Sequence, residues 1–392
     1  MKIAVIGQGY VGLPVAIAAV NANHDVVGID IDISKVSGLN KGLSPIDDIT
    51  HDQINQARET SRYLATSDFK QLQDSEIIVV CVPTPLKESS KPDFSYIESA
   101  AFQVGKYMKA DSLVIIESTV SPGTTRGLVS KILQGSEKSF YLAYSPERID
   151  PANKKWNITN TPKLVAGLTE EATKRAVKFY SSFVSEVIVG SSLEVIETAK
   201  LLENSFRLIN ISFINEFAEF CWKMQIDVRE VINAAATKPY GFMPFYPGAG
   251  VGGHCIPVDP SYLVAKAREI GASTKFIDLS NNINHSLPNY FTGVATGMLG
   301  ILKGKKIIII GVAYKPNVTD IRETPASGLI QALEEKGAEV LWHDDLVKEW
   351  LGKKSVDLSF GYDLAILVNP QVGIDLSALG SIPILDTRGG YL

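Results

Sequence analysis

The sequence predicts an α/β fold, with two Rossmann-like doubly wound domains joined by a long central helix and a helical section. Three observations support this prediction. In residues 1–193, short apolar runs alternate with helical stretches, which is typical of a parallel sheet covered on both faces. Residues 194–224 contain no proline or glycine and carry apolar residues at helical spacing. Near residue 303 the alternation of apolar runs and helical stretches returns.

The expected elements follow from these runs. In the first domain, residues 1–193, we expect a helix over residues 11–20 and strands over 2–6, 25–29, 76–82, 113–117 and 141–144, with a last strand from Val187. The middle section, residues 194–302, begins with the long helix, continues through a loop rich in glycine and proline (238–260), and ends in further helix. In the C-terminal domain, residues 303–392, we expect strands over 305–311, 339–342, 364–368 and 382–386 and a helix over 327–336.

Composition narrows the class of protein. Hydrophobic residues make up 45% and charged residues 21% of the 392 residues, as in ordinary globular domains. The net charge of −5 argues against a nucleic-acid partner, and the absence of an apolar run of about 18 residues argues against a membrane span. The three cysteines form neither a disulfide framework nor a CxxC pair, so we expect a reduced, cytoplasmic protein without a metal site.

A dinucleotide site is predicted where the first strand ends. Gly7, Gly9 and Gly12 fit the GxGxxG pattern between a strand and a helix, and Asp30 ends the second strand. The three glycines would allow the tight turn, the approach of the pyrophosphate and close packing of helix on strand. Asp30 would bind the ribose hydroxyls and repel a 2′-phosphate, which favours NAD over NADP. The alternative is a plain turn with an exposed aspartate.

Two threonine-bearing loops follow later strands of the same sheet. Thr84 and Thr119 lie after the third and fourth expected strands, where open α/β sheets bind ligands. They would line the nicotinamide side of the cofactor, although ordinary turn chemistry explains them equally well. Glu147 and Arg148 also follow a strand. They can serve as a general base or contact the sugar, and the alternative is an ordinary salt bridge in a turn.

Cys255 differs from the other two cysteines. Cys81 and Cys221 lie in apolar segments and are interpreted as small buried hydrophobes. Cys255 follows glycines that allow a ligand to approach closely, which makes it a candidate nucleophile, with a structural thiol as the alternative. Its neighbour His254 is interpreted as a structural or substrate-contacting residue.

Lys200 and Asn204 share one face of the long helix because they are four residues apart. Together they could hold a water or an oxyanion, whereas the alternative is a solvated polar pair.

In order along the chain, several segments resemble the UDP-glucose/GDP-mannose dehydrogenase family. They are residues 7–14 (GQGYVGLP), 117–120 (ESTV), 145–148 (SPER), Lys200 with Asn204, 252–255 (GGHC) with Asp259, 311–315 (GVAYK), 320–323 (DIRE) and 386–388 (DTR). The resemblance implies an N-terminal domain that binds NAD, a central helix that forms a homodimer, and a C-terminal domain that binds UDP. It favours a catalytic Cys255, Lys200 and Asn204 over their structural alternatives.

The resemblance also implies a four-electron oxidation in which Cys255 forms a thiohemiacetal and then a thioester. Lys200 and Asn204 would stabilise the oxyanion, and Asp259 and Glu147 would handle protons and water. The implied cofactor-binding residues are Gly7, Gly9, Tyr10, Val11, Gly12, Asp30, Lys35, Thr84, Thr119 and Arg322. The implied substrate-binding residues are Glu147, Arg148, Lys200, Asn204, Phe245, Tyr246, Gly252, Lys315 and Arg388.

The substrate prediction rests on two segments that depart from the UDP-glucose pattern of the family. Residues 145–148 read SPER and residues 238–248 read KPYGFMPFYPG, and both are similar to the branch that acts on UDP-N-acetylhexosamines. We expect UDP-N-acetylglucosamine to be oxidised at C6. The alternatives are UDP-glucose or UDP-N-acetylmannosamine, a two-electron hydroxyacid dehydrogenase, and a non-catalytic nucleotide-binding protein.

Overall fold

The computed structural model describes residues 1–88, 91–150, 152–153, 155–253 and 255–391. Its residues pack as two compact units. The first contains Met1–Leu202 and Ser261–Gly271, and the second contains Glu203–Pro260 and Ala272–Leu392. Two of the boundaries fall inside the long helix α7 (Leu193–Lys223) and inside helix α9 (Cys255–Glu269), and the third follows α9 after Gly271. The predicted division at residues 193 and 302 stays a prediction.

The first unit is built on an eight-stranded sheet. Its strands, in sheet order, are β3 (Tyr63–Thr66), β2 (Asp25–Ile29), β1 (Lys2–Ile6), β4 (Ile77–Val80), β5 (Ser112–Ile116), β6 (Phe140–Tyr144), β7 (Lys163–Gly167) and β8 (Val187–Val189). All neighbours pair in parallel except β6 and β7, which are antiparallel. The strands β1, β4 and β5 are almost wholly buried, as the apolar runs predicted.

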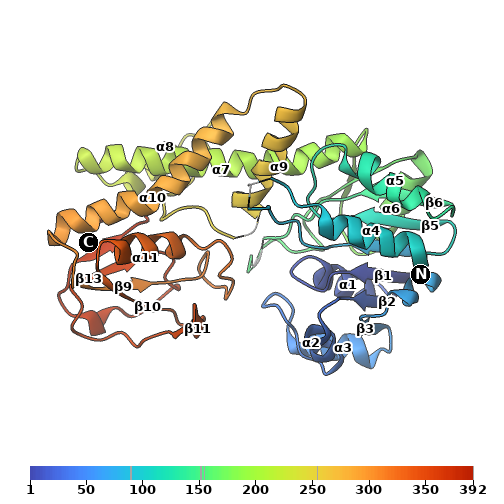
Figure 1. Cartoon of the computed structure of the whole chain (residues 1–392), viewed down its shortest axis with the longest axis horizontal. Helices are drawn as coiled ribbons and strands as arrows, with labels where there is room; N and C mark the ends of the chain where they lie inside the picture. Colours follow the sequence, from blue (N-terminus) through green and yellow to red (C-terminus); the bar gives the residue numbers. More distant parts are fainter. Residues whose placement is uncertain (89–90, 151, 154, 254, 392) are drawn as a thin grey trace. The chain divides into compact units, whose positions relative to one another are not determined.

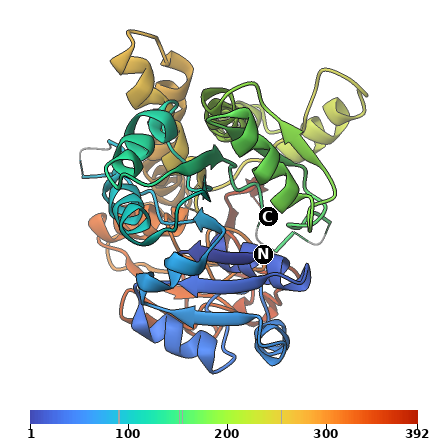
Figure 2. The ribbon, with the colours of Figure 1, turned by 90° about the vertical axis from the view of Figure 1, so that its right-hand side faces the viewer.

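Helices cover both faces of this sheet. One apolar core lies under α1 (Gly12–Asn21), α3 (His51–Glu59) and α6 (Glu170–Tyr180), and the other lies under α4 (Ser95–Tyr107), α5 (Ser130–Gln134) and the start of α7. Figure 2 shows the blue N-terminal strands of this unit side by side and flanked by helices. The remaining elements are α2 (Ile33–Asn40), η1 (Phe69–Asp74) and η2 (Thr125–Val129).

The second unit contains a smaller sheet in the order β10 (Glu339–His343), β9 (Lys306–Ile310), β13 (Leu364–Leu367), β14 (Ile384–Asp386) and β15 (Gly390–Tyr391). Helix α11 (Pro325–Glu335) packs on this sheet, and α10 (Lys275–Leu299) lies along α11 in Figure 1. The unit also contains α8 (Val228–Ala236), η3 (Ser377–Leu379) and the short pair β11 (Glu349–Trp350) and β12 (Lys353–Lys354).

The predicted fold class, α/β with two Rossmann-like units, is confirmed, and the long helix over 194–224 is observed as α7. The sequence prediction missed β3 and β7, because one exposes Leu64 and the other begins with a lysine, so neither reads as a continuous apolar run. The expected loop over 238–260 is wrong in its last six residues, because α9 begins at Cys255. Pro257 is compatible with this start, since the first turn of a helix does not use its backbone N–H groups.

Candidate active site

The glycine turn after β1 has the geometry that the sequence predicts. Gly7 has φ +90°, and a Cβ there would lie 2.4 Å from the carbonyl oxygen of Cys81. A Cβ on Gly12 would lie 1.9 Å from the carbonyl oxygen of Gly7, so this glycine is needed for the packing of α1 on the strand. Among the described residues other than its chain neighbours, no atom lies within 4 Å of a Cβ built on Gly9, so there is open space for a ligand at that position. Tyr10 and Val11 pack against the core beside it.

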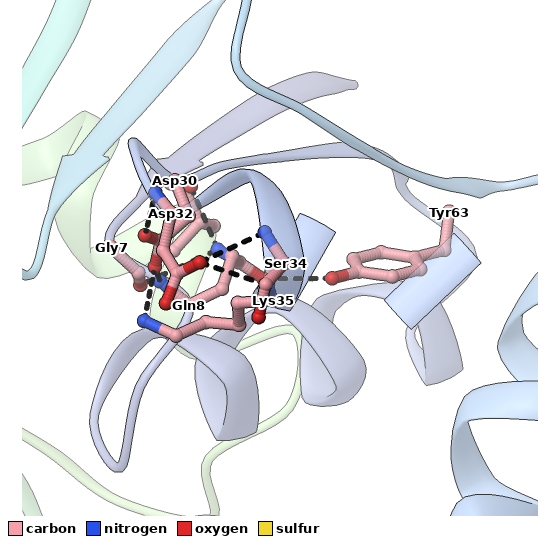
Figure 3. Close-up of polar contacts among 8 residues, drawn as sticks. Gly7, Gln8, Asp30, Asp32, Ser34, Lys35 and Tyr63 are labelled. Carbon is pink, nitrogen blue, oxygen red and sulfur yellow. Dashed lines mark hydrogen bonds and ion pairs between the residues drawn. The ribbon is translucent and has the colours of Figure 1, made fainter. Parts of the chain in front are cut away.

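Asp30 is fixed at the end of β2 by three donors (Figure 3). One of its oxygens accepts from the backbone N–H of Gln8 and from Lys35 Nζ, both at 2.8 Å, and the other accepts from the Asp32 amide at 3.0 Å. Burial acts to raise the pKa of the Asp30 carboxyl, but these hydrogen bonds outweigh burial and lower it. Asp30 is therefore ionised at neutral pH, and a carboxylate with an accepting lone pair left over suits the hydroxyls of a ribose. With Gly9, it fits an adenine dinucleotide.

We expect Asp30→Ala to weaken NAD binding about tenfold to a hundredfold, because hydrogen bonds to a charged acceptor contribute roughly 1.5–3 kcal/mol. A titration of the protein with NAD would measure the dissociation constant, and a parallel titration with NADP should show a smaller loss. Asp25→Ala is the matched control, since Asp25 begins the same strand and pairs with Arg62 on the surface. Unchanged NAD affinity in Asp30→Ala would contradict the assignment.

The two threonine loops lie side by side at the carboxyl ends of β4 and β5, which are paired strands. Thr84 is buried and Thr119 is half-buried. Between them, the Ser118 hydroxyl donates to the carbonyl of Val82 at 2.7 Å and so joins the two loops. Both threonines therefore lie at the edge of the sheet that also carries the glycine turn, where the sequence predicts the nicotinamide end of the cofactor.

Glu147 and Lys200 are in direct contact. Lys200 Nζ donates to the backbone carbonyl of Glu147 at 2.7 Å, and the lysine is 5% exposed. The side chain of Glu147 accepts from the backbone N–H of Ile149, and Arg148 donates to the carbonyl of Pro162 at 2.7 Å. Lys200 is therefore not on a solvated face of α7, which argues against the simpler interpretation of a surface lysine.

In the second unit, Cys255 is exposed and is the first residue of α9. The start of a helix is a favourable place for a thiolate, because the helix dipole is positive there. The loop before it needs its glycines, since a Cβ on Gly252 would lie 2.8 Å from Pro325 and one on Gly253 would lie 3.0 Å from the Tyr314 ring. His254 lies outside the described residues.

Asn204 and Asp259 form a buried pair in the same unit. Asn204 Nδ2 donates to Asp259 Oδ2 at 2.6 Å, and the two residues are 7% and 1% exposed. Asp259 lies one helical turn after Cys255 on α9, and Asn204 lies one turn after Lys200 on α7. The predicted catalytic asparagine and carboxylate are thus brought together, and each restricts the orientation of the other.

Three cationic residues follow strands or loops of the smaller sheet. Arg322 makes a two-pronged ion pair with Asp320, with the shortest contact at 2.6 Å, and Arg388 pairs in the same way with Asp386 at 2.8 and 2.9 Å. Lys315 Nζ lies 5.6 Å from the centre of the Tyr314 ring. Ammonium and guanidinium groups are of the kind that bind phosphate or a nucleotide.

Sequence reasoning missed two asparagines that hold the loop before Cys255. Asn215 on α7 accepts from the backbone N–H of Gly248 at 2.9 Å, and Asn284 on α10 accepts from that of Val251 at 2.7 Å. An amide within an apolar helical stretch is the only signal that the sequence carries for them. In the same loop, Phe245 packs edge-on against Phe206, and the Tyr246 hydroxyl contacts Asn233 at 3.1 Å.

Three features lie at the same edge of the sheet: a turn suited to a pyrophosphate, an ionised aspartate suited to a ribose, and loops that carry hydroxyl groups. Together they define a dinucleotide-dependent oxidoreductase. Matches to protein-family models define this class more narrowly. The models match the NAD binding domain of the UDP-glucose/GDP-mannose dehydrogenase family over residues 1–184, its central domain over 194–286 and its UDP binding domain over 308–370. The chain belongs to the UDP-glucose/GDP-mannose dehydrogenase family, as predicted from the sequence.

Individual relatives agree with this placement. The chain is 36% identical to Protein CapL of Staphylococcus aureus over 93% of its own length and 85% of that protein. It is 33% identical to the UDP-N-acetyl-D-glucosamine 6-dehydrogenase of Pseudomonas aeruginosa, over 92% of this chain and 86% of the relative. It is 35% identical to a UDP-N-acetyl-D-mannosamine dehydrogenase of Methanococcus maripaludis, over 88% and 79%.

Among solved structures, the UDP-D-ManNAc dehydrogenase of Pyrococcus horikoshii superposes with a TM-score of 0.91 at 30% identity, covering 99% of this chain and 95% of that one. The protein is an NAD-dependent nucleotide-sugar 6-dehydrogenase, and NAD is its cofactor, as predicted. No helix among the described residues is both long and apolar enough to cross a membrane.

Proposed function

We propose that the protein oxidises the C6 hydroxymethyl group of UDP-N-acetylglucosamine to a carboxylate, with Cys255 as the covalent catalyst. The observation that carries the chemistry is Cys255 itself, an exposed thiol at the start of α9. It follows a loop in which a Cβ on Gly252 or Gly253 would crowd neighbouring atoms. A thiolate adds to an aldehyde and also leaves from a thioester, so one side chain can serve both stages of a four-electron oxidation.

The proposed sequence has four steps. The C6 alcohol loses a proton and a hydride and becomes an aldehyde. The Cys255 sulfur adds to the aldehyde carbon while the aldehyde oxygen takes up a proton, giving a thiohemiacetal. The thiohemiacetal carbon then loses a second hydride and its hydroxyl loses a proton, which gives a thioester. Water then cleaves the carbon–sulfur bond, releasing the carboxylate and the thiol. NAD, when bound, supplies the hydride acceptor, one molecule for each of the two oxidations.

Four further side chains are proposed to assist these steps. Lys200 and Asn204 lie one turn apart on α7 and would stabilise the oxyanion that forms at C6. Asp259 and Glu147 are the candidates that accept protons and orient water. The contact between Asn204 and Asp259 supports this division, because it points the amide and the carboxylate at each other.

Nine residues are proposed to bind the substrate. They are Glu147, Arg148, Lys200, Asn204, Phe245, Tyr246, Gly252, Lys315 and Arg388, of which Lys315 and Arg388 would contact the phosphate or the uridine. Thr84, Thr119, Lys35 and Arg322 are proposed to complete the cofactor site. The donors of Lys315 and Arg388 at the ends of the smaller sheet support a role in binding phosphate or uridine.

The choice of sugar rests on the segments 145–148 and 238–248 and on the names of the relatives. Those names include both a UDP-N-acetyl-D-glucosamine and a UDP-N-acetyl-D-mannosamine dehydrogenase at similar identity. UDP-N-acetylmannosamine and UDP-glucose therefore remain the alternatives to the proposed substrate.

With limiting UDP-N-acetylglucosamine and excess NAD, we expect about two NADH per sugar, because each of the two hydride transfers yields one. Absorbance of NADH measures this ratio, with UDP-glucose and UDP-N-acetylmannosamine run alongside. One NADH per sugar would contradict the role of Cys255. Two NADH from another sugar, and none from this one, would leave the mechanism intact and overturn the choice of substrate.

We also propose a homodimer formed through the central helix. Phe206, Phe213 and Phe220 are 45–60% exposed, and their spacing places them on one face of α7. Met224, directly after the helix, is 58% exposed. Exposed aromatic residues in a row are typical of an interface rather than of a solvated surface. The predicted cytoplasmic location stays a prediction.

A further inference from the structure

A buried ion pair lies beneath the loops of the first unit and has no part in the proposed chemistry. Lys163, the first residue of β7, lies with its Nζ 2.8 Å from Glu117 Oε2. The side chains are 9% and 0% exposed. Burying two charges costs free energy, and their mutual attraction often does not offset that cost. Such a pair is therefore weak evidence that it stabilises the fold. The presence of this pair therefore calls for an explanation other than stability.

The contacts of Lys163 suggest an explanation for the buried pair. Besides the ion pair, Nζ donates to the backbone carbonyl of Pro146 at 3.1 Å and lies 5.0 Å from the centre of the Tyr180 ring. The Tyr180 hydroxyl donates to the second oxygen of Glu117. Burial, together with the Glu117 carboxylate, raises the pKa of Tyr180 well above its ordinary value, so the hydroxyl keeps its proton.

This network joins the loops that carry the predicted site residues. Glu117 directly follows β5 and precedes Ser118 and Thr119, in the loop that Ser118 joins to the one carrying Thr84. Pro146 precedes Glu147, whose backbone carbonyl accepts from Lys200 Nζ at 2.7 Å. One chain of contacts therefore runs from the end of β5 through Lys163 and the peptide of Pro146 to Lys200.

We propose that Lys163 is a positioning residue: paired with Glu117, it fixes the Pro146–Glu147 backbone so that the carbonyl of Glu147 holds the Lys200 ammonium in place. The proposal rests on the proposed function, in which Lys200 stabilises the oxyanion. An apolar residue at position 163 cannot fill this role, because the Pro146 carbonyl is buried and needs a donor.

Two variants separate positioning from stability. Lys163→Met leaves Glu117 charged and buried, so we expect the melting temperature to fall by roughly 10 °C and kcat to fall with it. The triple variant Glu117→Met, Lys163→Met, Tyr180→Phe replaces the whole network by apolar groups, which is often neutral for stability. We expect its melting temperature to fall by less than that of Lys163→Met, because the Pro146 carbonyl still lacks its donor but no unpaired charge is buried. Its kcat should nevertheless stay about a hundredfold low, since small displacements of catalytic groups have effects of this order.

In both variants, KM for NAD should change far less than kcat. Lys174→Met, which removes an exposed pair with Glu170 on α6, is the matched control and should leave kcat unchanged. A triple variant with the kcat of the wild type would overturn the proposal, whatever its melting temperature.

A second measurement does not depend on turnover. Hydrogen exchange of the backbone amides of residues 147–150 should be faster in Lys163→Met and in the triple variant than in the wild type, while the amides of β1 should be unaffected. Unchanged exchange at 147–150 would also overturn the proposal. A wild-type protein that forms no NADH with any nucleotide sugar would instead count against the proposed function, and the exchange data would still decide whether Lys163 fixes this segment.

Discussion

Replacing Cys255 with serine is expected to lower the rate of carboxylate formation roughly a thousandfold or more, the order of loss found when a covalent nucleophile is removed. A serine hydroxyl is a much poorer nucleophile than a thiolate at neutral pH, so the aldehyde would not be captured. The first oxidation does not require the sulfur. We therefore expect at most one NADH per sugar, with aldehyde detectable by a carbonyl-specific reagent.

The control for this variant is Cys221→Ala. Cys221 is buried on α7, in a small apolar cluster with Ile214 and Val228, and has no role in the proposed chemistry. It should keep the NADH ratio of the wild type. Two NADH per sugar from Cys255→Ser at a rate near that of the wild type would rule out the covalent mechanism, and melting curves of both variants would exclude unfolding as the cause of any loss.

Replacing Lys200 with methionine is expected to lower kcat about a hundredfold to a thousandfold, the magnitude associated with removal of one oxyanion-stabilising donor. Methionine keeps much of the length and apolar stem of the side chain but removes the ammonium group that contacts the Glu147 carbonyl. The interaction with the oxyanion forms as the charge develops, so KM for the sugar should change much less than kcat. Steady-state kinetics with each nucleotide sugar would measure both constants.

Lys223→Met is the matched control on the same helix, because Lys223 is 75% exposed and pairs with Glu219 one turn away. Exposed pairs of this kind contribute little, so kcat and the melting temperature should be those of the wild type. If Lys200→Met kept a kcat within about threefold of the wild type, although loss of an oxyanion donor should lower it far more, the oxyanion role would have to pass to another group.

The sequence by itself determined the features that depend on local pattern. The alternation of buried apolar runs with helical stretches was sufficient for the α/β class, because a strand buried on both faces must be apolar throughout. Gly7, Gly12 and Asp30 were identified from spacing alone, since the turn tolerates no Cβ and the aspartate ends the adjacent strand. Cys255 was singled out by its glycines, and the family followed from the order of the motifs.

Only the tertiary structure decided which polar side chains meet. Asn204 and Asp259 are 55 residues apart in sequence, and Glu117 and Lys163 are 46 apart, so no local pattern connects either pair. The sequence left Lys200 open between a surface lysine and a buried one, because spacing on a helix defines a face but not what covers it. Its burial, like that of Lys163, depends on packing between distant segments, and a single sequence does not encode those contacts in any short-range pattern.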